Sequence, residues 1–199
     1  MKRFFPMFSG VALALALISM SPAAEAATGA GLDAADLPAK TRADLKAEID
    51  KARVQTPELF KQVEDVAARA KEIEAGGRAP GIPFTMHFKP LGQRALYPML
   101  ELLVFDSHTT KDLSPAAQSA LRLGLIEAIG GIRDARAVPV LAKMIEMGRD
   151  DMTVRASAEG LARIGTDESV NLLIAAATKA KTSDAGAGRE RAILNGMHD

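Results

Sequence analysis

The residues best suited to acid–base chemistry or metal binding are three histidines far apart in the sequence, His87, His108 and His198. His87 has no second histidine, cysteine or paired carboxylate nearby in the sequence to complete a site, and His108 lies in a polar loop. The chain contains no cysteine, no HExxH, no Gly-x-Ser-x-Gly and no glycine-rich phosphate loop followed by lysine. We therefore predict a non-enzymatic protein without catalytic residues, metal site or cofactor.

The N-terminus has the order of a secretory signal peptide. Lys2 and Arg3 precede an apolar run over residues 11–18, and Ala24-Glu25-Ala26 forms a small-residue cleavage site. The alternative, a membrane anchor, needs about 20 apolar residues, roughly twice this run. We expect cleavage after residue 26, and a periplasmic or secreted bacterial protein that is not inserted in a membrane after cleavage. Without cysteine, neither lipid anchoring at the cleavage point nor disulfides are available.

Composition favours an all-α fold and argues against nucleic acid as a partner. Removing residues 1–26 leaves acidic and basic side chains nearly balanced, so no long-range attraction draws the protein to nucleic acid or anionic lipid. Aromatic residues make up 4% of the chain and tryptophan is absent, while alanine and leucine abound. Small apolar side chains suit closely packed helices better than sheets, which favour β-branched and aromatic residues.

The N-terminal third divides into three segments. Residues 27–39 are small and aperiodic, which predicts a flexible leader. Residues 40–77 carry two amphipathic patterns separated at Thr56-Pro57, which predict a helical hairpin; a coiled-coil arm for a partner is the alternative. Residues 78–92 are proline-rich, and alternating apolar residues from Ile82 to Phe88 predict an extended connector whose role is open.

From residue 93 the helical period continues, and the chain repeats itself. Residues 128–141 superimpose on residues 160–173, thirty-two positions later, so that Ile132 matches Ile164 and Leu141 matches Leu173. Such a period is typical of stacked helical repeats. Helices are expected to begin at Ser114, Asp134, Asp151 and Asp167 and to end at Gly130-Gly131 and Gly165, with apolar positions Val138, Leu141, Val170, Leu173 and Ile174 in the core.

The repeated residues resemble the HEAT repeat, in the short bacterial subtype named after phycobilisome lyases. The resemblance rests on residues 128–141 (AIGGIRDARAVPVL), on Asp151 with Val154-Arg155, and on residues 160–165 (GLARIG). It covers about residues 94–197 and implies a short α-solenoid over 93–199. It also implies a charge ladder between repeats through Asp151 and Arg155; a plain N-cap explains Asp151 equally well.

In such a solenoid the second helix of each pair lines the binding face. Residues projected outward from those helices form a mixed apolar and charged strip that suits a protein or peptide partner, and an idle solvated face is the alternative. The candidates are Met99, Leu102, Arg136, Val140, Lys143, Met147, Glu168, Leu172 and Lys179.

We therefore expect an exported scaffold that binds a protein or peptide through its repeats. The alternatives are a repeat-built enzyme of lyase type that uses His87 or His108, and a structural subunit of an envelope assembly that makes contact through the N-terminal hairpin. Residues 189–199 resemble the start of a further repeat, so a short capping helix and an array truncated at Asp199 are both open. The sequence predicts neither the partner nor the oligomeric state.

Overall fold

The computed structural model describes residues 30–70, 72, 82–106, 109–148, 150–181 and 187–198. The predicted signal peptide and His108 lie outside these residues. Within them the fold is all-α, as predicted, and contains no β-strand. The helices are α1 (Ala39–Gln55), α2 (Pro57–Ala68), α4 (Ile82–Phe88), α5 (Leu96–Val104), α6 (Pro115–Ile132), α7 (Val138–Met147), α8 (Asp151–Ile164), α9 (Asp167–Lys181) and α10 (Ala187–His198). Short 3₁₀ turns are η1 (Ala34–Asp36), η2 (Lys89–Leu91), η3 (Gln93–Ala95) and η4 (Ala135–Ala137).

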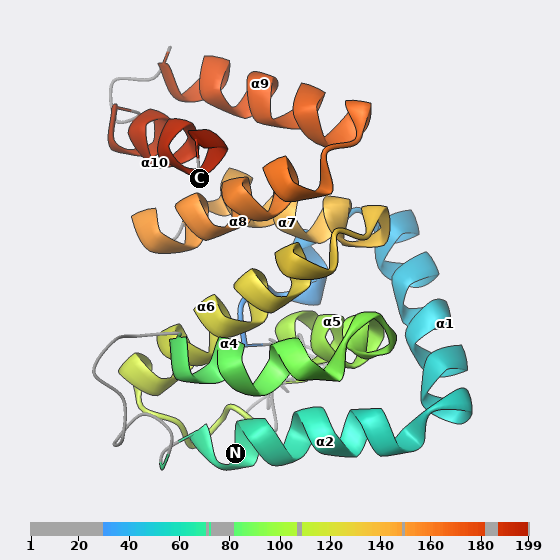
Figure 1. The fold of residues 1–199 in the computed structure, drawn as a ribbon. Coiled ribbons are helices and arrows are strands. Elements are labelled where there is room, and N and C mark those ends of the chain that lie inside the picture. Colours follow the sequence, from blue (N-terminus) through green and yellow to red (C-terminus); the bar gives the residue numbers. More distant parts are fainter. Residues whose placement is uncertain are drawn as a thin grey trace, which may run out of the picture.

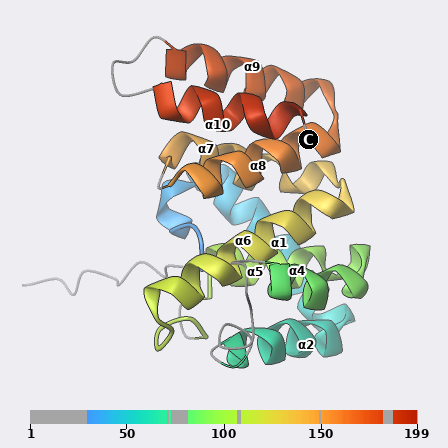
Figure 2. The same cartoon turned by 60° about the vertical axis from the view of Figure 1, so that its left-hand side comes forward.

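The helices from α4 onward stack in two layers (Figure 1). One layer contains α4, α6, α8 and α10, each packed on the next, and the other contains α5, α7 and α9. Figure 2 shows α7 behind α8 and α9 behind α10, so that consecutive helices pair across the layers. The core between the layers includes Leu141 and Leu173, at 0% and 1% exposure, as the repeat pattern predicts.

Polar caps and left-handed residues set the helix ends. Ser114 accepts a hydrogen bond from the Ala117 backbone N–H, with Pro115 in the first turn of α6. Gly148 and Gly165 end α7 and α8 with positive φ angles of 55° and 68°, which glycine adopts without steric cost. The prediction that Gly130-Gly131 ends a helix is wrong, because α6 continues through both to Ile132.

Gly130 serves close packing instead. A Cβ atom at this position would lie 2.6 Å from the Gly160 Cα atom on α8, so the backbones of the two helices touch where they cross. Gly196 on α10 lies similarly close to α8, where an added Cβ would be 2.9 Å from the Ala158 Cβ. The layer formed by α6, α8 and α10 is therefore stacked through small residues.

The flexible leader predicted for residues 27–39 is corrected from residue 30 onward. The backbone N–H groups of Ala30 and Gly31 donate to the carbonyl oxygens of Leu102 and Leu103 at 2.9 and 3.0 Å, which satisfies acceptors in the last turn of α5. The Leu32 and Leu37 side chains are 1% and 3% exposed. We call residues 30–38 the N-terminal strap.

The predicted hairpin and extended connector also differ in the structure. Helices α1 and α2 meet at Thr56 and diverge, α1 running along the stack while α2 lies across its end, and both pack on α5 (Figure 1). Residues 82–88 form α4, in which Phe84 and Phe88, four positions apart, are 1% and 0% exposed. A helix buries this pair on one face, and Pro83 is tolerated in its first turn.

Candidate partner-binding groove

A groove of about 560 Å³ lies between α7 and α9. Its apolar lining comes from both helices, with Pro139, Ala142 and Ile145 on α7 and Leu172 and Ala176 on α9. Pro38 of the strap and Thr41 of α1 form part of the wall. The second helices of two successive repeats therefore build one concave surface, and the N-terminal segment borders it.

Charged side chains surround this apolar lining. Lys143 pairs with Glu146 at 3.0 Å on α7, Glu168 lies in the first turn of α9, and Lys179 lies in its last turn. Arg189 of α10 also lines the groove, and its guanidinium lies against Gly148 at the C-terminal end of α7. A cation there is favoured by the negative end of the helix dipole. The groove thus combines apolar contact area with charges of both signs.

The structure brings four of the predicted binding residues together in this groove: Lys143, Glu168, Leu172 and Lys179. Met147 is half-buried on α7 and is not part of the lining. Arg136 lines a second pocket. Sequence reasoning missed several other lining residues, among them Pro38, Thr41 and Arg189. Pro38 and Thr41 precede the repeats, where no periodic signal points to them.

Three of the residues predicted to be on the binding surface are buried. Met99 and Leu102 on α5 are 1% and 2% exposed, because α1 and α2 pack on that helix. Val140 on α7 is 1% exposed and belongs to the core. The projection treated every second helix as uncovered, whereas the N-terminal helices cover the first of them.

An ion pair between α6 and α8 involves Asp150, the residue before Asp151, and the ladder through Asp151 and Arg155 stays a prediction. Asp150 is the N-cap of α8 and accepts hydrogen bonds from the Thr153 backbone N–H at 2.7 Å and from the Arg122 guanidinium of α6 at 2.9 Å. Arg122 also donates to the Thr153 hydroxyl at 3.0 Å. Burial alone raises the pKa of Asp150, but the bonds from Thr153 and Arg122 outweigh it and lower that pKa. Asp151 and Arg155 are exposed on α8.

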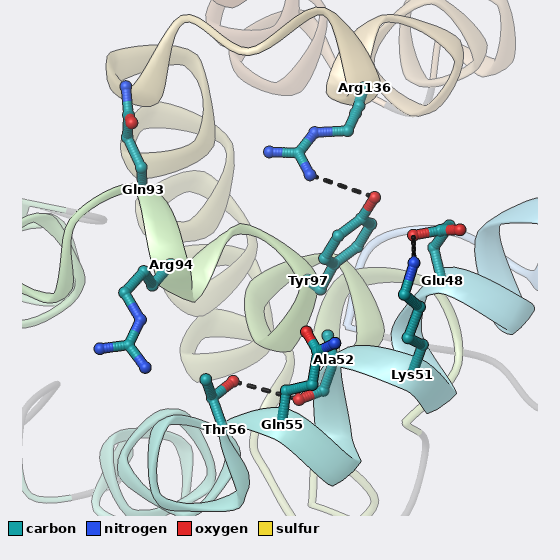
Figure 3. Close-up of a pocket in the computed structure, with 9 residues that line it drawn as sticks. All are labelled: Glu48, Lys51, Ala52, Gln55, Thr56, Gln93, Arg94, Tyr97 and Arg136. Carbon is teal, nitrogen blue, oxygen red and sulfur yellow. Dashed lines mark hydrogen bonds and ion pairs between the residues drawn. The ribbon is translucent and has the colours of Figure 1, made fainter.

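The second pocket, of about 410 Å³, lies where α1, α5 and η4 meet (Figure 3). Its polar lining includes Gln55, Gln93 and Tyr97, and the Arg136 guanidinium lies 4.9 Å from the centre of the Tyr97 ring. Arg136 also binds both carboxylate oxygens of Asp134, which lowers the pKa of Asp134 and raises that of Arg136. These contacts hold Arg136 against the pocket wall and leave fewer of its donors for a ligand.

The two histidines that the structure describes, His87 and His198, line neither pocket. His87 is exposed on α4 and His198 is exposed at the end of α10. Among the described residues, no group of three or more histidine, cysteine, aspartate or glutamate side chains is arranged to hold a metal ion. In the same part of the chain, no helix combines the length and apolar character that a membrane span requires.

The two-layer stack of helix pairs, with its 32-residue period, places the protein in the class of helical-repeat α-solenoids. Residues 110–193 match the family model for HEAT repeats, so this part of the chain consists of HEAT repeats. No match was found among curated proteins or solved structures. HEAT repeats commonly mediate protein–protein interaction.

Proposed function

We propose that this protein is an exported, non-enzymatic scaffold, built on the phycobilisome-lyase-like HEAT subtype, that binds a protein or peptide partner in the α7–α9 groove. The observation that carries the proposal is the convergence of Lys143, Glu168, Leu172 and Lys179, from two successive repeats, on one concave surface. Apolar lining with charges of both signs suits a peptide segment, since the apolar area supplies affinity and the charges fix its orientation.

Site-specific photocrosslinking in the native host tests the site. A photoreactive residue in place of Leu172, on the groove lining, should give a discrete protein adduct, whereas one in place of Val54, which is 84% exposed on α1, should give none. The adduct should disappear when Lys143 and Lys179 are both changed to glutamate. Adducts of equal yield from both positions, or an adduct that the charge reversal leaves unchanged, would contradict binding in the groove.

Export has its own support and its own test. The support is the signal-peptide order of residues 1–26, in which Lys2 and Arg3 precede an apolar run over residues 11–18 and the small-residue site Ala24-Glu25-Ala26. N-terminal sequencing of the protein from periplasmic and culture fractions should give Ala27 as the first residue. Recovery of a chain that retains residues 1–26 from the cytoplasm would sink the proposal of export while leaving the groove unaffected.

A non-enzymatic role predicts that the histidines are dispensable. Changing His87 or His108 to alanine should leave the groove adduct unchanged and should not cause the cellular phenotype that loss of the whole protein causes. His87 lies on α4 and is not part of the groove lining. If either change abolished the phenotype while the adduct persisted, the repeat-built enzyme would become the better account.

A further inference from the structure

Helix α9 exposes an apolar face that its repeat counterpart α7 uses for packing. Val170 and Ile174 on α9 are 41% and 53% exposed, which corrects their assignment to the core. Thirty-two positions earlier, Val138 is 0% exposed, and Ala142 lines the groove toward α9. In the described part of the chain, no helix covers the corresponding face of α9.

This face has charges of opposite sign at its two ends. Positions 167, 170, 174, 178 and 181 are separated by three or four residues, so they lie on one side of the helix, and all five are exposed. Asp167 is at one end and Lys181 at the other, each seven residues, or about two turns, from Ile174. The charge pattern therefore changes sign about Ile174.

Helix α10 also exposes large apolar side chains. It packs beside α9 (Figure 2), and its Leu194 and Met197 side chains are 42% and 40% exposed. Four of the seven large apolar side chains that are markedly exposed in the described residues belong to these two helices. Apolar side chains gathered at one end of a molecule, with charges at the rim, are typical of an interaction surface.

We propose that two copies of this chain associate through α9, antiparallel about a twofold axis that passes near Ile174. A self-complementary contact of this kind places each residue opposite the one equally distant on the other side of the axis. Ile174 then packs on the partner's Ile174, and Asp167 lies opposite the partner's Lys181. The twofold axis generates this pair of opposite charges twice. A parallel arrangement would instead bring like charges together, so the charge pattern selects a second, antiparallel copy as the occupant.

The dimer leaves the proposed binding groove free. The groove residues Glu168, Leu172 and Lys179 lie at helical spacings that place them on the side of α9 opposite Val170 and Ile174. Two grooves therefore remain open in one assembly. This inference goes beyond the proposed function and does not depend on it.

Sedimentation velocity on the purified protein, in the form in which cells accumulate it, tests the proposal. At about 50 µM the wild-type protein should sediment as a dimer that dissociates on dilution. Ile174→Asp should sediment as a monomer at the same concentration. The matched control Val54→Asp, which changes a residue 84% exposed on α1, should remain dimeric. A monomeric wild-type protein, or an Ile174→Asp variant that dimerises as well as the wild type, would overturn the proposal.

Charge reversal tests the antiparallel register. Asp167→Lys and Lys181→Asp should each raise the dimer dissociation constant about tenfold at low salt, because each replaces two attractive contacts with two repulsive ones. The double variant restores both contacts and should recover wild-type affinity. Any cost of either substitution to α9 itself persists in the double variant, so recovery reports the intermolecular pairing. A double variant no tighter than the single variants would overturn the antiparallel register.

Discussion

One carboxylate, that of Asp150, joins two successive repeats. It caps α8 through Thr153 and binds Arg122 of α6, whose side chain is only 13% exposed. The bonds that lower its pKa stabilise the ionised form in the folded state. Because the pKa is lower in the folded than in the unfolded state, this stabilisation is present above the unfolded pKa. It is lost as pH falls through the folded pKa.

Asp150→Asn removes the negative charge but keeps the N-cap, because asparagine caps helices about as well as aspartate. The variant should be about 1 kcal/mol less stable at pH 7, since Arg122 loses its anionic partner. It should also lose less stability than the wild type when pH falls from about 5 to below 3. Urea unfolding across this range measures both effects, and Asp151→Asn, at the exposed neighbouring position, is the control. Parallel pH profiles for wild type and Asp150→Asn would refute the assignment.

The contact between α6 and α8 depends on the glycine at position 130. An added methyl group would meet backbone, which cannot move aside as a flexible side chain would. Gly130→Ala should therefore cost about 1–3 kcal/mol, as overpacking of a core does. Gly131, the next residue on α6, has nothing within 4 Å of an added Cβ, so Gly131→Ala should be neutral or stabilising by up to about 1 kcal/mol. The melting temperature should fall for Gly130→Ala and stay the same or rise for Gly131→Ala, and equal destabilisation by both would contradict the close contact.

For individual helices, the sequence predicts those of the repeats well and the segments that connect them poorly. Leu141 and Leu173 recur with the repeat period, and both are buried because each helix pair packs on the next. In the sequence, a glycine such as Gly130 is compatible with a helix end and with a close contact between two helices. In the structure it lies at the contact between α6 and α8. The pair Phe84 and Phe88 fits both the alternation of a strand and the four-residue spacing of a helix. Burial of both side chains on one face of α4 selects the helix.

The same limit applies to the candidate site. Lys143, Leu172 and Lys179 were predicted because they project from repeated helices, and the groove contains all three. The prediction that Met99 lies on the binding surface is wrong because α1 and α2, which do not share the period of the repeats, cover this residue. Sequence periodicity indicates which side of a helix faces outward within the repeat. It carries no information about a segment from elsewhere in the chain that covers that side.

For the molecule as a whole, the N-terminal strap is part of the solenoid. Gly31 is enclosed by side chains of α5, α6 and α7, since an added Cβ would lie within 3.2 Å of Leu103, Met144 and Arg122. The strap therefore fills the space between two repeats that their own helices leave open. Its last residue, Pro38, continues directly into the wall of the groove.

Leu32→Ala tests how far the repeats depend on the strap. Because the Leu32 side chain is 1% exposed, its truncation to alanine should lower the free energy of unfolding by about 2–5 kcal/mol, as truncation of other buried leucines does. The control Val54→Ala, at a position 84% exposed, should stay within about 0.5 kcal/mol of wild type. If the strap and the repeats unfold as one unit, Leu32→Ala should also reduce the hydrogen-exchange protection of amides in α5 and α7, measured by mass spectrometry. Loss of protection confined to residues 30–38 would show instead that the strap is an appendage that the repeats do not need.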